Sequence, residues 1–176
     1  AELPRMAGRA DDDDPAGLAR AAARIPRTAT FGDYRGMLDA ARPEIVAIGP
    51  RWIDRHAEMA CEALERGIHV YLEKPCCRSL AEADRIIRAG EMTHAKLALA
   101  HTTRYSPVLA RVQELIEAGQ IGRVLELRGR GKEDARGGGE DLWVLGSHVL
   151  NLFATIAGPA EWCFATVRDG GEPIAR

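Results

Sequence analysis

The sequence has little of what marks several common classes of protein. Aromatic residues make up only 5% of its 176 residues. No apolar run approaches the ~20 residues that a membrane-spanning helix needs. Lys and Arg number 24 against 26 Asp and Glu, so the net charge is -2 and no positive excess favours nucleic acid or an anionic membrane. The hydrophobic content of 46% is enough for a sizeable core, so we expect a globular protein whose partner is a small molecule.

The few cysteines lack the spacing of a zinc site. They contain no Cys-x-x-Cys pair, and no histidine lies at zinc-finger distance from Cys61, Cys76, Cys77 or Cys163. We therefore predict no metal site and interpret all four as packed thiols. Because Cys76 and Cys77 are adjacent, one of them facing an active site is the alternative, although nothing in the sequence makes either a nucleophile.

The N-terminal part predicts two helices. An acidic run, Asp11 to Asp14, is closed by Pro15 and followed by an alanine-rich helix over residues 16–25. A short helix is expected over residues 36–41. The first ten residues have no initiator methionine and no apolar signal core, so the compartment stays unknown. Cytoplasmic is the default, and an export signal further upstream is not excluded.

The middle of the chain alternates strands and helices. Strands are expected over three short apolar runs, residues 44–48, 68–72 and 96–100. Helices follow them, over residues 56–66, 79–90 and 107–118. Gly67 stands where a left-handed cap would end the first of these helices, Ser79 and Glu82 form a capping box, and Gly90 is expected to end the second. Such alternation predicts an α/β fold with a parallel sheet covered by helices on both faces.

Beyond Gly122 the pattern changes. A strand is expected over residues 124–127, a glycine-rich loop through 137–139, a helix over 147–157 and a strand over 162–167. We therefore place a domain boundary near Gly122, with one domain over residues 1–122 and part of a second over residues 123–176.

Two strand ends carry candidate ligand contacts, because open parallel sheets bind ligands beyond the carboxyl ends of their strands. Gly49 and Pro50 follow the first expected strand, and a glycine there lets a dinucleotide approach the backbone closely. Ordinary loop chemistry explains a Gly-Pro turn equally well. Glu73, Lys74 and Pro75 follow the second strand, where the alternative is a solvated ion pair.

The stretch from Pro43 to Pro75 resembles the signature region of the glucose-fructose oxidoreductase and inositol dehydrogenase (Gfo/Idh/MocA) family. The positions in register with that region are His56, residues 67–70 and residues 73–75. The resemblance continues through residues 104–107, 117–124 and 137–151. It implies a Rossmann-type doubly wound parallel sheet over residues 1–122 and the start of an α+β domain, for substrate binding and oligomerisation, over residues 123–176. The family's opening strand and Gly-x-Gly-x-x-Gly turn are not in this sequence, so we expect the chain alone to bind a dinucleotide poorly.

The resemblance also implies an activity. Members of this family transfer a hydride between NAD or NADP and a hydroxyl or carbonyl of a sugar, polyol or related small molecule. A homo-oligomer is expected for the full-length protein. The alternative is a non-enzymatic ligand-binding or regulatory relative that keeps the fold without turnover.

In such enzymes the glutamate and lysine of the turn lie beside the nicotinamide ribose and the substrate hydroxyl, and the proline often follows a cis peptide bond. The resemblance therefore assigns the cofactor to Gly49, Pro50, His56, Glu73, Lys74, Pro75 and Arg104. If Asp12 matches the end of the second family strand, it accepts the adenosine ribose hydroxyls and favours NAD over NADP. A helix cap on a solvated loop is the alternative for that acidic run.

Lys74 and His148 are the catalytic candidates. With Gly146 and His148 in register, the family's aspartate position holds Val144. An imidazole accepts a proton near neutral pH, and the charge of Lys74 favours the alkoxide of the substrate. An imidazole base works best when another group holds its second nitrogen, so Asp141 or Asn151 is expected to replace the missing aspartate. Otherwise Lys74 is the main proton acceptor and His148 only binds substrate.

Overall fold

The computed structural model describes residues 8–10, 14–24, 28–50, 53–131, 141–169 and 171–173. Contacts divide the chain into two compact units, Ala1–Ala100 and His101–Arg176. The domain boundary expected near Gly122 stays a prediction.

The first unit contains five parallel strands in two separate sheets. β1 (Gly8–Ala10) pairs with β2 (Ala29–Phe31), and β4 (His69–Leu72) lies between β3 (Ile45–Ile48) and β5 (Leu97–Leu99). The three predicted strands and their parallel arrangement are confirmed. The sequence patterns did not indicate β1 and β2, which are only three residues long.

The first two helices of this unit begin where a short polar side chain accepts a backbone hydrogen bond. The Asp14 carboxylate accepts from Gly17 N ahead of α1 (Pro15–Arg24), and Asp33 accepts from Gly36 N ahead of α2 (Tyr34–Ala41). A 3-10 turn, η1 (Ile53–Arg55), leads into α3 (His56–Glu65), after which Gly67 has a φ of 75°.

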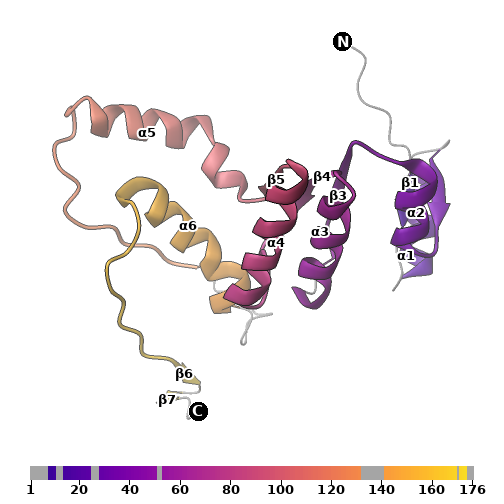
Figure 1. Ribbon diagram of the computed structural model, residues 1–176. Helices are drawn as coiled ribbons and strands as arrows, with labels where there is room; N and C mark the ends of the chain where they lie inside the picture. The colour runs from indigo at the N-terminus through magenta and orange to yellow at the C-terminus, as the bar shows by residue number, and fades with distance from the viewer. Residues whose placement is uncertain are drawn as a thin grey trace. The chain divides into compact units, whose positions relative to one another are not determined.

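The capping box at Ser79 is confirmed, but the predicted end of its helix at Gly90 is wrong. Ser79 accepts from Glu82 N, and α4 (Leu80–Thr93) continues until His94 takes the left-handed conformation. A Cβ at Gly90 would lie 3.1 Å from Ala95 O, so the missing side chain leaves room for the segment just after α4, whereas the 3.9 Å to Leu64 Cδ2 on α3 is an ordinary contact. Figure 1 shows α4 beside α3.

The core of the first unit lies between its helices and its strands. Leu72 on β4 is fully buried and Leu64 on α3 is 1% exposed. Tyr34, Met37 and Leu38 on α2 belong to the same apolar cluster, so α2 packs into one core with α3 and α4. This packing fixes the strand ends from which the candidate turns project.

The second unit is mainly helical. It contains η2 (Thr102–Tyr105), α5 (Pro107–Glu117), the π-helical segment η3 (Asp141–Leu145), α6 (Gly146–Ala157) and the two-residue antiparallel strands β6 (Arg168–Asp169) and β7 (Glu172–Pro173). The two predicted helices are confirmed as α5 and α6. The strands predicted over residues 124–127 and 162–167 are wrong, because a strand forms only by pairing and no described strand pairs with either segment. Their apolar side chains are exposed, Leu125 to 81% and Phe164 to 85%.

Candidate active site

The carboxyl ends of β3 and β4 lie side by side. The register pairs Ile48 with Leu72, so the turns that follow the two strands start at the same edge of the sheet. Glu73 N donates to Ile48 O at 2.8 Å, which extends the ladder one residue past β4. The two turns predicted from the sequence, at Gly49 and at Lys74, are therefore neighbours.

The turn after β3 leaves its backbone accessible. Gly49 is exposed, and a Cβ at this position would meet nothing within 4 Å. Pro50 is half-buried. The open space beside Gly49 fits the close approach of a flat or extended ligand along the backbone.

The turn after β4 is held by its own carboxylate. Glu73 and Lys74 are both half-buried, and Lys74 N donates to Glu73 Oε2 at 2.6 Å. The Lys74–Pro75 peptide bond is cis, as the resemblance led us to expect, and Pro75 is buried. The carboxylate of Glu73 is thus turned back onto the turn, whereas a solvated ion pair would hold it away from the backbone.

His56 connects the two turns. It is the first residue of α3 and is 0% exposed. Its Nδ1 lies 2.7 Å from Pro75 O and its Nε2 lies 2.9 Å from Pro50 O. A carbonyl oxygen only accepts, and a neutral imidazole has one N–H, so both contacts are hydrogen bonds only when both ring nitrogens carry a proton. Both nitrogens of His56 face the backbone, and its predicted part in cofactor binding stays a prediction.

Burial raises the pKa of two of the cysteines. Burial, followed by the neighbouring Cys77, raises the pKa of Cys76 to about 12, and burial also raises the pKa of Cys61. Cys77 Sγ donates to Ser79 O at 3.3 Å. A nucleophilic cysteine needs a thiolate, so the raised pKa argues against Cys76 as a nucleophile. Cys163 is exposed, and the expectation that it is packed is wrong.

The second unit brings two histidines together. His148 is half-buried in the first turn of α6, and its ring meets that of His101 edge to face, with 5.7 Å between the centroids. His101 itself is 9% exposed. Sequence reasoning gave His101 little weight, although it lies two positions after β5, as Lys74 lies two positions after β4, and so meets the same strand-end criterion.

Around the position of the family's aspartate, the described hydrogen bonds go to backbone carbonyls. The backbone carbonyl of Val144 accepts from Ser147 Oγ at 3.1 Å, and that of Asn151 accepts from Thr155 Oγ1 at 2.8 Å. The side chain of Asp141 lies outside the described part of the chain. The orienting role of Asp141 or Asn151 stays a prediction.

Two further cofactor candidates lie elsewhere. Arg104 is an exposed residue of η2 in the second unit, and its backbone N donates to His101 O. Asp12 lies outside the described residues, two positions after β1 ends at Ala10. The first unit therefore brings together Gly49, Pro50, His56, Glu73, Lys74 and Pro75, whereas Arg104 and His148 belong to the second.

Within the described ranges, no group of three or more His, Cys, Asp or Glu side chains is arranged to hold a metal ion. The described helices are all too short or too polar to cross a membrane.

Comparison with known proteins gives a family match. The family model described as "Oxidoreductase family, NAD-binding Rossmann fold" matches residues 12–101. A 1-carboxy-3-chloro-3,4-dihydroxycyclohexa-1,5-diene dehydrogenase from Comamonas testosteroni is 33% identical over 65% of this chain and 29% of its own length. A levoglucosan dehydrogenase from Pseudarthrobacter phenanthrenivorans is 32% identical over 69% of this chain and 31% of its own length.

Solved structures have the same fold. An oxidoreductase from Desulfitobacterium hafniense DCB-2, described as NADPH-dependent, is 26% identical with a TM-score of 0.74, covering 90% of this chain and 50% of that one. The chain therefore spans less than a third of those two curated relatives and half of this solved one. Its parallel α/β architecture is Rossmann-like.

Proposed function

The chain belongs to the Gfo/Idh/MocA oxidoreductase family, which has an NAD-binding Rossmann fold, and on that premise we propose that the full-length protein transfers a hydride between a nicotinamide cofactor and a hydroxyl or carbonyl group of a sugar, polyol or related small molecule. One observation carries the proposal: the turns after β3 and β4 lie at one sheet edge, with Lys74 on the second of them. This is the edge at which open parallel sheets bind ligands.

The residues at that edge suit a nicotinamide ribose. Gly49 leaves open space beside the backbone, and Glu73 presents a carboxylate held by Lys74 N. When bound, the nicotinamide supplies the hydride acceptor or donor. We assign Gly49, Pro50, Glu73 and Pro75 to its surroundings, and Arg104 and Asp12 as cofactor contacts that the family resemblance suggests. We favour NAD over NADP on the premise that Asp12 accepts the adenosine ribose hydroxyls.

Lys74 is assigned to the substrate oxygen. Oxidation of an alcohol leaves negative charge on that oxygen as its proton departs, and an ammonium group beside it lowers the energy of the transition state. His148 is assigned as the base that takes the proton. Lys74 then stabilises the negative charge and His148 moves the proton. In the alternative, Lys74 also accepts the proton.

A second candidate is a relative that binds the ligand without turnover. Val144 favours it, because an aliphatic side chain at this position supplies no carboxylate to orient His148. The two candidates differ in hydride transfer.

The test uses the full-length protein. Calorimetric titration with NAD and with NADP measures cofactor binding, and a screen of sugars and polyols, beginning with levoglucosan, follows the absorbance of reduced nicotinamide. Binding together with turnover supports the oxidoreductase. Binding without turnover in either direction favours the second candidate, and failure to bind either cofactor contradicts the oxidoreductase. By the same resemblance we propose a homo-oligomer, which sedimentation of the full-length protein tests.

A further inference from the structure

We propose that His56 is a positioning residue that ties the Pro50 turn to the Lys74–Pro75 turn through the contacts of its two ring nitrogens with Pro50 O and Pro75 O. The proposal rests on the proposed function for its kinetic consequences. The two carbonyl contacts themselves, at 2.7 and 2.9 Å, come from the structure alone.

The geometry carries the proposal. His56 has no exposed surface, and each of its ring nitrogens lies within hydrogen-bonding distance of one carbonyl oxygen, Nδ1 beside Pro75 O and Nε2 beside Pro50 O. Each carbonyl belongs to a different turn, so the one ring spans both.

The two bonds have different consequences. Pro50 O belongs to the turn that leaves Gly49 open, so the Nε2 bond positions the side of the site assigned to the cofactor. Pro75 O follows Lys74 directly, so the Nδ1 bond positions the side assigned to the substrate oxygen. A single buried side chain thus couples the spacing of the two turns, and losing one bond frees one turn.

Asparagine and glutamine separate the two bonds. The amide nitrogen of asparagine takes the place of Nδ1 and that of glutamine the place of Nε2. In the full-length protein, His56→Gln keeps the Pro50 bond and frees the Lys74 turn, so kcat should fall on the order of 100-fold, the penalty for an ångström-scale misplacement. His56→Asn keeps the Pro75 bond, so the dissociation constant of the cofactor should rise about tenfold, with a smaller effect on kcat.

His69 provides the matched control. Its Nδ1 accepts from Lys96 N at 3.0 Å, at the amino end of β4, away from the two turns. His69→Gln should therefore lower stability without the split between kcat and cofactor affinity. If both His56 variants change kcat and affinity as little as His69→Gln does, His56 is a structural residue and the proposal is overturned.

A spectroscopic measurement is independent of activity and of variants that fail to fold. In the unsubstituted full-length protein labelled with nitrogen-15 and carbon-13, a ring N–H of His56 should exchange slowly with water and show a coupling across a hydrogen bond to the carbonyl carbon of Pro50 or Pro75. A ring whose N–H protons exchange as fast as those of free imidazole would overturn the proposal. Failure of hydride transfer alone would contradict the proposed function and leave this result standing.

Discussion

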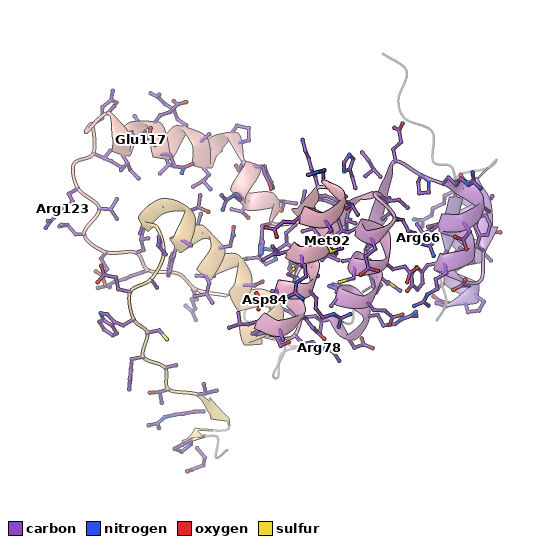
Figure 2. All side chains as sticks on the ribbon, in the orientation of Figure 1. Arg66, Arg78, Asp84, Met92, Glu117 and Arg123 are labelled. Carbon is purple, nitrogen blue, oxygen red and sulfur yellow. The ribbon has the colours of Figure 1, made fainter. Side chains whose placement is uncertain are left out.

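Polar contacts between α2 and α3 connect parts of the first unit that no described backbone ladder joins. α2 packs on β1 and β2, whereas α3 packs on β3 and β4, and the two sheets share no described hydrogen bonds between strands. Tyr34 OH donates to Glu58 Oε1 at 3.1 Å, and Arg35 pairs with the same carboxylate. Arg66, labelled in Figure 2, reaches Asp39 on α2. Removing the Tyr34 hydroxyl should therefore change the free energy of unfolding by an amount that depends on pH.

The magnitude follows from the titration of Tyr34, which is 7% exposed. Burial, followed by the hydrogen bond and the negative charge of Glu58, raises the pKa of Tyr34 from 10 to about 12. The unfolded chain loses this proton near pH 10, while the folded chain keeps it. The stabilisation, about 3 kcal/mol for a shift of two pKa units, is fully present below pH 10 and lost as the pH rises through about 12.

Tyr34→Phe removes that pH dependence. Below pH 10 the variant should lose only about 1 kcal/mol, because the lost hydrogen bond leaves Glu58 paired with Arg35. As the pH rises from 10 toward about 12, the unsubstituted protein should lose about 2 to 3 kcal/mol that the variant keeps, so the two free energies of unfolding should cross and the variant should be the more stable protein near pH 12. Urea unfolding of the full-length protein at a series of pH values measures the difference.

Tyr71→Phe is the control, since the Tyr71 side chain is 44% exposed on β4. It should leave the pH dependence of the unfolding free energy close to that of the unsubstituted protein. Parallel loss of stability in Tyr34→Phe and the unsubstituted protein across the same window would refute the assignment of the alkaline transition to Tyr34.

Two further substitutions test the turn and the core. In the full-length protein, Lys74→Ala should lower kcat on the order of 100-fold and change the cofactor dissociation constant by less than about tenfold, because the lysine charge acts mainly in the transition state. Steady-state kinetics measures kcat, and calorimetry measures the dissociation constant. Normal turnover with reduced stability would make Lys74 a surface residue. Leu72→Ala, at a fully buried position, should cost about 3–5 kcal/mol in urea unfolding. Leu80→Ala, at a position 85% exposed, should change stability by no more than about 0.5 kcal/mol, and similar values for the two leucines would contradict the assigned core.

The part of the fold that follows from local pattern was predictable. A short continuous apolar run such as residues 45–48 predicts a strand, although Ile45 and Ala47 on β3 are exposed. Gly67 and Ser79 carry end signals whose geometry depends on a few neighbouring atoms. These signals located β3, β4, β5 and the helices between them. They also placed two candidate turns at strand ends, which the β3–β4 register then made neighbours.

The errors arise where structure depends on a distant partner. β1 and β2 are three residues each and are strands because they pair with one another. Residues 124–127 have a suitable composition, but no described strand pairs with them. Gly90 has the residue type of a helix end, yet the space beside Ala95 decides its role. None of these outcomes is encoded in the local sequence.

In the candidate site, too, some residues could be predicted from the sequence and some contacts could not. Strand ends and family resemblance indicated Glu73 and Lys74, but not the contacts of His56, because these exist only once Pro50 and Pro75 converge on one ring. His101 was overlooked because its neighbour His148 lies 47 positions away in the sequence and the resemblance assigned it no role.

A carboxylate at position 144 would add a negative charge beside His148. A nearby negative charge favours the protonated form of an imidazole. Residues 144 and 148 are four apart on consecutive helical segments, which is the spacing of neighbouring side chains. Val144→Asp in the full-length protein should therefore move the pH at which His148 loses its proton upward by about one unit.

The pH–rate profile tests both residues in the full-length protein. His148→Asn should lose most turnover while cofactor binding persists, because an amide cannot accept the substrate proton at these pH values. Leu150→Asp is the control for Val144→Asp, since it adds the same charge at an exposed position two residues along α6, where side chains do not face His148. Equal shifts from the two aspartates would mean that a general field acts on the site. If His148→Asn leaves the profile and its height unchanged, His148 has no part in proton transfer and Lys74 is left as the proton acceptor. If the unsubstituted protein itself shows no turnover, the protein is a ligand-binding relative.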